Sequence, residues 1–324
     1  MDTTTQIFIG AVIADLLGRK TFSRKAFFIG AGCNLLLDVI SFLPSRYEEI
    51  MLNHAQHWSH TPAAILALGI VFTAVLSIKL KNWQQIGILV FTILTVHVVL
   101  DTMSTNGILL LYPFSHSLFH IECLAHFEPI LFVGFLLGAI IAYKKRNLYW
   151  NRRILIFGAC YLIFSYALSM QAKRTLTPML NQMGFSRDSL QITNVPYIFL
   201  LRRVTAKDAR NRFAIAYFGP FSLRPPRIWV RKSEVNAQTK SLLQSSLGQN
   251  LLYRSHSMVF VERVNNRYIF SDVRHGSFSD PWFSPYQAQS TIMKGVPGPL
   301  FYTQSYSRNT FFDDIDNGWQ LLLH

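Results

Sequence analysis

Apolar runs of membrane length fill the first half of this chain and limit what it can fold into. An α-helix needs about 20 mainly apolar residues to cross a bilayer, within a range of roughly 17–25. Runs of this kind predict a multi-pass helical membrane core. The candidate segments cover residues 7–17, 26–43, 62–80, 86–101, 129–143 and 154–170.

These segments differ in how well their lengths suit a bilayer. Residues 62–80 and 154–170 fit well, and residues 26–43 and 86–101 fit if their polar ends reach the interface. Residues 129–143 are short but rich in Leu, Ile, Phe and Gly, and residues 7–17 are short enough to be re-entrant or tilted. We therefore expect five to six membrane segments.

Charge separates the chain into two parts. Residues 1–170 hold 12 Lys and Arg against 8 Asp and Glu, whereas residues 171–324 hold 19 against 9. The predicted fold class is a multi-pass α-helical membrane core with a C-terminal, β-rich soluble domain, α+β overall. We expect a helical membrane domain at 1–170, a connector at 171–190 and a basic β-rich extramembrane domain at 191–324.

The second half shows strand-like runs separated by Pro, Gly and Asn. The runs cover residues 197–201, 213–218, 228–230, 258–264 and 267–270, with a hairpin signal at Val264–Arg267. Its arginines could attract phospholipid head groups or other anions. No nucleic-acid recognition module is visible, so nucleic acid is not an expected partner. A plain lid or scaffold over the membrane site is the alternative interpretation.

Basic linkers predict the orientation. Lys and Arg follow the first, third and fifth segments, whereas residues 44–61 contain Arg46 alone and residues 102–128 contain none. By the positive-inside rule, the loops 44–61 and 102–128 and the C-terminal domain would face outward, into the periplasm or the medium. The basic C-terminal domain argues mildly against this, but large domains translocate largely regardless of charge. The two loops share one side whenever residues 62–80 and 86–101 both span.

Histidines gather between the apolar segments. Seven of the ten lie between residues 54 and 126: His54, His57, His60, His97, His116, His120 and His126. Histidine is the commonest metal ligand and the usual proton carrier near neutral pH. Ionisable groups packed among membrane segments are costly, and their default interpretation is functional.

The strongest pair is His97 and Asp101, which share one helical face because they are four residues apart. They can bind one cation, or the carboxylate can orient the imidazole; a mutually satisfied pair that only joins helices is the alternative. His54, His57 and His60 form a second group of candidate site residues. The alternative is that they belong to a solvated loop at the membrane interface. Asp38 stands at the end of an apolar run, where it is either a metal ligand or the cap of a turn.

The 102–128 loop adds further polar groups, namely His116, His120, Glu122, His126 and Glu128. Some of these side chains could support the metal ligands or contact a substrate. For His116 and His120 we favour a solvated interfacial face.

At these residues the chain resembles the YdjM-like family of LexA-binding, inner-membrane-associated proteins regarded as metal-dependent hydrolases. The segment His97–Gly107, followed by Leu111–Ser115, is similar to the family pattern H-x-x-x-D-x-x-[ST]-x-x-G and its Tyr-Pro-Phe-Ser-like run. Met1–Gln6 looks like the family's opening, and Ser271–Gly276 looks like an Asp-x-Arg-[YH]-Gly motif of longer members. The resemblance covers residues 1–143 well and 190–276 loosely.

The chain departs from this pattern in two places. The family's Pro-Asp-x-Asp becomes Leu37–Ile40, which keeps only Asp38, and the H-R-G portion becomes Ala55–His57, which leaves His60 as the clear match. His54 or His57 would then replace the lost first histidine. Fewer carboxylates favour zinc over magnesium, and manganese and magnesium are the alternatives. They also raise the alternative that hydrolysis has been lost.

The sequence thus predicts a membrane-bound metal-dependent hydrolase of the bacterial inner membrane, acting at the membrane surface. Asp38, His60, His97 and Asp101 would hold one or two divalent ions, and His54 or His57 would serve as an auxiliary ligand or base. The expected partners are membrane lipids and an anionic, phosphoester or lipid-linked substrate, and a protein partner is left open. The rival hypothesis is a non-enzymatic membrane scaffold with a structural or degenerate metal site.

Overall fold

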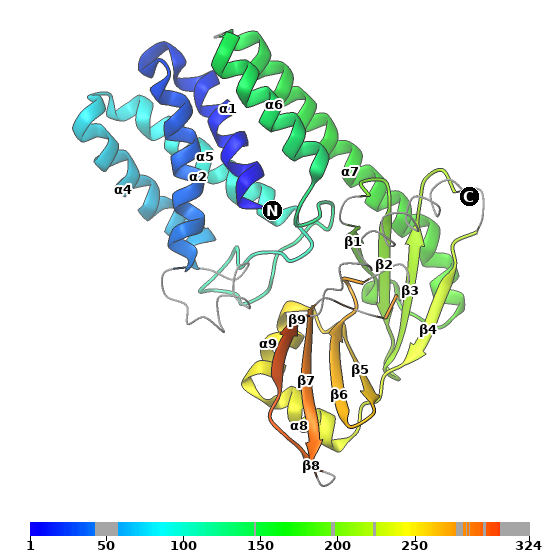
Figure 1. Cartoon of the computed structure of the whole chain (residues 1–324). Coiled ribbons are helices and arrows are strands. Elements are labelled where there is room, and N and C mark those ends of the chain that lie inside the picture. Colours follow the sequence, from blue (N-terminus) through cyan, green and yellow to red (C-terminus); the bar gives the residue numbers. More distant parts are fainter. Residues whose placement is uncertain are drawn as a thin grey trace. The chain divides into compact units, whose positions relative to one another are not determined.

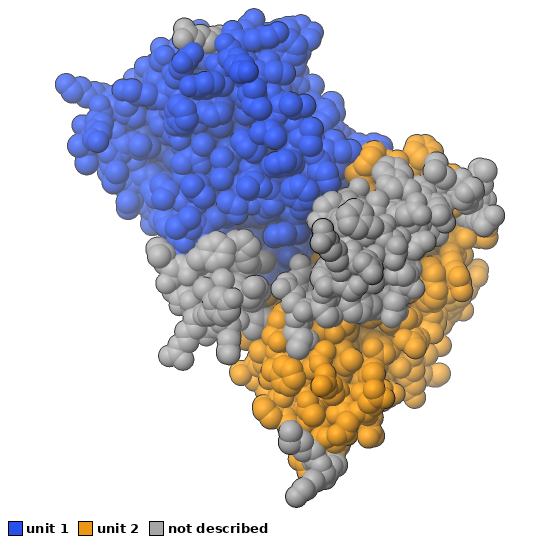
Figure 2. Space-filling view, viewed as in Figure 1, with its two compact units in different colours: residues 1–166 blue, residues 167–324 orange. Residues whose placement is uncertain are grey.

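The computed structural model divides into two compact units, residues 1–166 and 167–324 (Figure 2). The residues that the structure describes are 1–42, 58–145, 147–195, 198–222, 225–276, 281–282, 284, 286–293 and 296–304.

The first unit is helical (Figure 1). Its elements are α1 (Thr3–Phe22), α2 (Lys25–Phe42), the 3₁₀ turn η1 (Trp58–His60), α4 (Pro62–Leu80), α5 (Trp83–Thr102), α6 (Pro129–Lys145) and the first part of α7 (Leu148–Gln182). Among the described residues, α4, α5 and α7 are long and apolar enough to cross a membrane. The predicted helical membrane core is therefore confirmed with three candidate spans, and the further predicted spans stay predictions.

Local sequence signals explain where several helices begin. Asp2 caps α1 by accepting a hydrogen bond from the Thr5 amide at 2.8 Å. Thr61 caps α4 in the same way through the Ala64 amide at 3.2 Å, and Pro62 occupies the first turn, where its missing N–H costs nothing. Because Thr61 directly follows His60, this cap also fixes where η1 ends.

The surface of α4 matches a lipid environment. Leu66, Ile70, Val75 and Ile78 are all exposed, although each is a large apolar side chain. Such a face would be costly in water and suits acyl chains. The opposite face of α4 packs on α5, where Leu89, Val90, Ile93 and Leu94 belong to the core.

Helices α1 and α2 approach closely at two glycines. A Cβ atom added to Gly30 would lie 2.1 Å from the carbonyl oxygen of Gly10, and one added to Gly10 would lie 2.4 Å from Asn34 Nδ2. Small residues at a helix crossing let backbones come together in this way. The crossing places the second half of α2, including Asn34, against the start of α1.

The second unit is built from two antiparallel sheets with two short helices. The first sheet has the order β1-β2-β3-β4, and in the second β7 pairs with β6, β8 and β9. The elements are β1 (Gln191–Asn194), β2 (Arg202–Lys207), β3 (Arg212–Phe218), β4 (Ile228–Lys232), α8 (Ala237–Gln244), α9 (Ser246–Arg254), β5 (Val259–Val264), β6 (Arg267–Asp272), β7 (Tyr286–Met293), β8 (Val296–Pro297) and β9 (Phe301–Gln304). The β-rich prediction is confirmed.

The hairpin signal at Val264–Arg267 is also confirmed. These two residues pair at the end of the β5–β6 ladder, and Asn265 adopts a φ of 52° in the turn between them. The predicted runs at 213–218, 228–230 and 267–270 lie within β3, β4 and β6.

The predicted strand at 197–201 is wrong for its described part. The backbone from Ile198 to Leu201 forms a turn, closed by a 2.9 Å hydrogen bond from the Leu201 amide to the Ile198 carbonyl. The strand begins one residue later, at Arg202. Two adjacent arginines look like surface residues, but the exposed fractions of Arg202 and Arg203 are 0% and 2%.

The Asp-x-Arg-His-Gly segment is a junction inside this unit. Asp272 accepts hydrogen bonds from Arg274 Nη2 at 2.7 Å and Nε at 3.0 Å, and Arg274 Nη2 also donates to the Arg254 carbonyl at 2.6 Å. A Cβ atom at Gly276 would lie 2.6 Å from the Arg203 guanidinium, so only glycine fits there without a shift. Arginines expected to attract external anions are therefore partly interior: Arg203 and Arg274 are both buried.

Candidate metal centre

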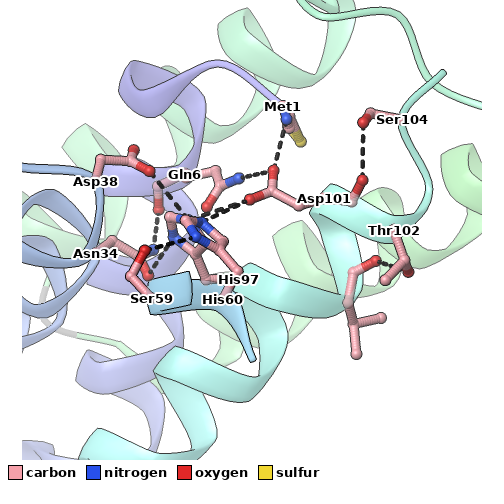
Figure 3. Close-up of polar contacts among 11 residues, drawn as sticks. Met1, Gln6, Asn34, Asp38, Ser59, His60, His97, Asp101, Thr102 and Ser104 are labelled. Atoms are coloured by element: carbon pink, nitrogen blue, oxygen red, sulfur yellow. Dashed lines mark hydrogen bonds and ion pairs between the residues drawn. The ribbon is translucent and has the colours of Figure 1, made fainter. Parts of the chain in front are cut away.

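Four buried side chains from three elements converge in the first unit (Figure 3). Asp38 comes from the last turn and a half of α2, His60 from η1, and His97 and Asp101 from one face of α5. The N-terminal cap of α4 holds η1 in place, and the one-turn spacing in α5 aligns its two side chains.

Four contacts of 3.2–3.3 Å link the polar atoms of these side chains. His97 Nε2 lies 3.2 Å from Asp38 Oδ1, 3.3 Å from Asp101 Oδ2 and 3.3 Å from His60 Nε2. His60 Nε2 in turn lies 3.2 Å from Asp101 Oδ2. These four atoms therefore gather around one small centre, at which the ligand atoms of Asp38, His60 and His97 all lie within 4.8 Å of one another.

Neighbouring side chains aim both imidazoles at that centre. His97 Nδ1 lies 3.3 Å from Asn34 Oδ1, and His60 Nδ1 lies 3.0 Å from Ser59 Oγ. Since an amide oxygen can only accept, the Asn34 contact places the proton of His97 on Nδ1. Nε2 is then left as a lone-pair donor that faces the centre. An outer hydrogen bond of this kind is the usual way to fix a metal-binding histidine.

The two oxygens of Asp101 have different partners. Oδ1 accepts hydrogen bonds from the α-amino group of Met1 at 2.6 Å and from Gln6 Nε2 at 2.7 Å. Oδ2 faces the two imidazoles instead. Gln6 is also tied to α2, because Asn34 Nδ2 donates to its backbone carbonyl. These contacts hold the carboxylate of Asp101 in one orientation.

A metal ion explains this spacing better than a set of direct ion pairs. Charge-assisted N–H···O bonds are usually about 2.7–2.9 Å long, shorter than the 3.2–3.3 Å separations here. A single proton on His97 Nε2 also cannot serve three neighbours at once. Asp38, His60 and His97 form a buried group that could hold a metal ion. Asp101 adjoins this group as a fourth donor.

A cavity of about 50 Å³ opens beside the cluster. This is room for a few water molecules or one small polar group. Its lining residues are Met1, Asp38, His60, Asp101, Ser104, Asn106, Gly107, Ile108 and His126. The cavity therefore joins three cluster residues to the start and end of the 103–128 segment.

The other sequence candidates that the structure describes are not among these four donors. His54 and His57 fall outside the described residues. His120 Nε2 lies 3.4 Å from Glu122 Oε1, and the His116 ring packs edge-on against Tyr112 with centroids 5.4 Å apart. Of the loop histidines described, His126 is the one that lines the cavity.

Glu128 has a role within the fold. It accepts hydrogen bonds from the Ala125 amide at 2.6 Å and from the Tyr161 hydroxyl at 2.5 Å. These contacts tie the start of α6 to α7.

Sequence reasoning missed the residues that support the ligands. Gln6, Asn34 and Ser59 all contact cluster residues and are buried. A signal was available for Asn34, since it precedes Asp38 by four residues and so shares its helical face.

The buried cluster and the apolar helices around it define a helical membrane protein with a candidate metal centre. Residues 1–172 match the model of the YdjM inner membrane protein family. The match covers more than half of the chain, and the chain belongs to this family. No curated protein and no solved structure matches it.

Proposed function

We propose that this protein is a membrane-bound metal-dependent hydrolase that acts at the membrane surface. The observation that carries the proposal is the buried Asp38, His60 and His97 group, with Asp101 in contact with both imidazoles at 3.2–3.3 Å, beside a small cavity. A cluster that only joined helices would have no need of an adjoining cavity.

The donor set favours zinc. Zinc bonds of 2.0–2.2 Å place neighbouring ligands about 3.3 Å apart in a tetrahedral arrangement, close to the four contacts that the two imidazoles make. An octahedral magnesium site needs ligands about 2.9 Å apart and prefers oxygen donors. Two imidazoles beside two carboxylates therefore suit zinc, with manganese as the nearest substitute.

Each residue then has a defined role. Asp38, His60, His97 and Asp101 bind the ion, and the adjoining cavity leaves a further position that water can reach. Asn34 and Gln6 orient His97 and Asp101. A divalent ion held there would polarise the substrate and supply activated water near neutral pH. His54 or His57 is the proposed auxiliary ligand or base. In the hydrolysis of a phosphoester, the water oxygen bonds to phosphorus, the P–O ester bond breaks, and the departing alkoxide takes up a proton.

The surroundings of the site suggest the substrate class and the location. The ligands lie at the ends of α2 and α5, where a membrane helix meets the head groups, so an anionic phosphoester or lipid-linked group is the proposed substrate. By the positive-inside rule, we propose that this face and the C-terminal unit lie outside the cytoplasm. Membrane lipids are the proposed partners, and a protein partner stays open.

A non-enzymatic scaffold is the second candidate. It is favoured by Ile40, which stands where the family pattern has its second carboxylate. A structural metal site is closed by four protein ligands, whereas a catalytic one keeps an open position. The two candidates therefore differ in whether a small anion or water can reach the ion.

Metal analysis of the purified full chain in detergent tests the proposal. We expect about one equivalent of zinc or manganese in the wild type, and loss of that metal in His97→Ala and Asp101→Ala. His116→Ala is the matched control, since it removes an imidazole outside the cluster and should keep the metal. A wild type that is folded but binds no metal would refute the hydrolase proposal.

If the metal is present, a phosphoesterase and lipase screen of the loaded protein follows. Activity lost in His97→Ala and kept in His116→Ala supports the enzyme. Stoichiometric metal without activity, together with an ion that azide or cyanide cannot reach, supports the scaffold.

A further inference from the structure

The segment that follows α5 carries no charged side chain, and its part after Leu110 is largely exposed. Residues 103–119 contain no Asp, Glu, Lys or Arg. Ile108 and Phe119 pair through two backbone hydrogen bonds of 3.0 and 2.8 Å, which close the chain between them into a loop. We call residues 108–119 the apolar loop.

The apolar loop exposes its largest side chains. Phe114 is 96% exposed, Leu111 58% and Phe119 49%. Single exposed apolar residues are common on protein surfaces, but a group of this size on one uncharged loop marks an interaction site.

The position of the loop identifies what covers it. Its segment begins directly after Thr102, the last residue of a candidate membrane span, and leads to α6. A loop at the end of a span lies at the bilayer surface, where aromatic side chains are enriched. The Tyr112 ring, packed on His116, has the mixed apolar and polar character of such a position.

The base of the apolar loop is also a wall of the cavity. Gly107 and Ile108 line the cavity beside Asp38, His60 and Asp101. Gly107 has a φ of 70°, and a Cβ atom there would lie 2.9 Å from the Phe119 carbonyl oxygen. Glycine therefore lets the two arms of the loop meet beside the candidate metal centre.

We propose that the apolar loop inserts into the lipid head-group layer and guides a bilayer lipid, by its polar group, to the cavity. Lipid contact follows from the loop alone. The substrate class, a membrane lipid instead of a free soluble ester, rests on the proposed hydrolase function. An acyl chain beside Leu111 and Phe114 would leave the head group at the cavity wall formed by Ile108.

Fluorescence quenching in nanodiscs tests the insertion. A bimane label is placed at Phe114→Cys in the full chain carrying Cys160→Ser, because Cys160 is the exposed native cysteine while Cys33 and Cys123 are buried. We expect loss of emission with doxyl-labelled phosphatidylcholine and little loss with aqueous iodide. The same label at Arg210→Cys, in the exposed β2–β3 turn of the second unit, is the comparison for a polar surface position. Iodide quenching of the 114 label without doxyl quenching would overturn the proposal in favour of an aqueous partner.

Adding His97→Ala to the labelled protein separates the two proposals. The doxyl quenching should persist in that variant, because lipid contact does not need the metal. If the doxyl quenching is lost in the His97→Ala variant, the metal centre orders the apolar loop. Insertion independent of the metal would then be wrong.

Hydrolysis of two probes tests the substrate class. The probes are p-nitrophenyl phosphate in solution and dioleoyl phosphatidic acid in vesicles, with phosphate release as the readout. We expect the double variant Leu111→Ser, Phe114→Ser to lose vesicle hydrolysis and to keep hydrolysis of the soluble ester. Equal effects on both probes would contradict lipid guidance. A wild type that cleaves neither probe would contradict the hydrolase proposal, and the quenching result then decides lipid contact by itself.

Discussion

Replacing Gly30 by alanine should weaken metal binding without touching any ligand. The Cβ atom of the new side chain would lie 2.1 Å from the Gly10 carbonyl oxygen and 2.4 Å from Ala14 Cβ. Ordinary van der Waals contact starts at 3.4 Å, so α1 and α2 must separate by about 1.3 Å at this crossing. The obstacle is mainly helix backbone, which cannot turn aside as a flexible side chain can.

The separation matters because α2 carries Asp38 while α1 carries Gln6. Asp38 lies two helical turns beyond Gly30, and ligand distances must hold to about ±0.2 Å for tight binding. Even a small part of the 1.3 Å shift exceeds that tolerance. We expect at least about a 10-fold loss of metal affinity, which is about 1.4 kcal/mol.

Gly32→Ala is the matched control for this prediction. It adds the same methyl group to the same helix, two residues away, where no atom lies within 4 Å. Zinc competition with a chromophoric chelator measures the affinity of both variants, and circular dichroism checks their helix content. Equal zinc affinity in Gly30→Ala and wild type, with both folded, would show that the crossing does not position the cluster.

Three further predictions address the outer contacts and the second unit. Asn34→Leu removes the acceptor for His97 Nδ1 and should lower metal affinity about 10–100-fold; chelator competition that shows no change would contradict an orienting role. Gly276→Ala places a methyl group 2.6 Å from the buried Arg203 guanidinium and should destabilise the protein by about 1–3 kcal/mol, seen as a lower Tm. Burial alone would raise the pKa of Asp272, but the charge and hydrogen bonds of Arg274 hold that pKa below its ordinary value. The pair therefore stabilises the fold above about pH 4 and loses this contribution as the pH falls further. Melting curves of the full chain should show Asp272→Asn well below wild type at pH 7, with a gap that narrows below about pH 4; a constant gap would contradict the assignment.

Much of the helical unit could be predicted because its signals are local. The apolar run at 62–80 and the helix α4 have the same bounds, since Pro62 and its Thr61 cap mark the start and Lys81 turns the chain at the end. The one-turn spacing of His97 and Asp101 likewise determines that they share a face, and the structure places their polar atoms 3.3 Å apart.

Contacts between distant segments could not be predicted in this way. Gln6 and Asn34 meet only because two glycines let α1 and α2 come close, and no spacing within one helix reveals a crossing. The start of β2 was missed for a related reason. Arg202 and Arg203 look solvated in sequence, yet Ser169 Oγ and the carbonyl oxygen of Val273 accept hydrogen bonds from their guanidinium groups inside the unit.

The order of the cluster residues along the chain bears on biogenesis. All four donors, and the side chains that orient them, lie within the first 101 residues of 324. Once α5 has left the ribosome, every donor of the candidate metal centre has already been synthesised. The ribosome still has the whole β-rich unit to synthesise at that stage. Metal capture can therefore precede release of the finished polypeptide, and an ion bound early would fasten α2, η1 and α5 together while the rest of the protein is being made.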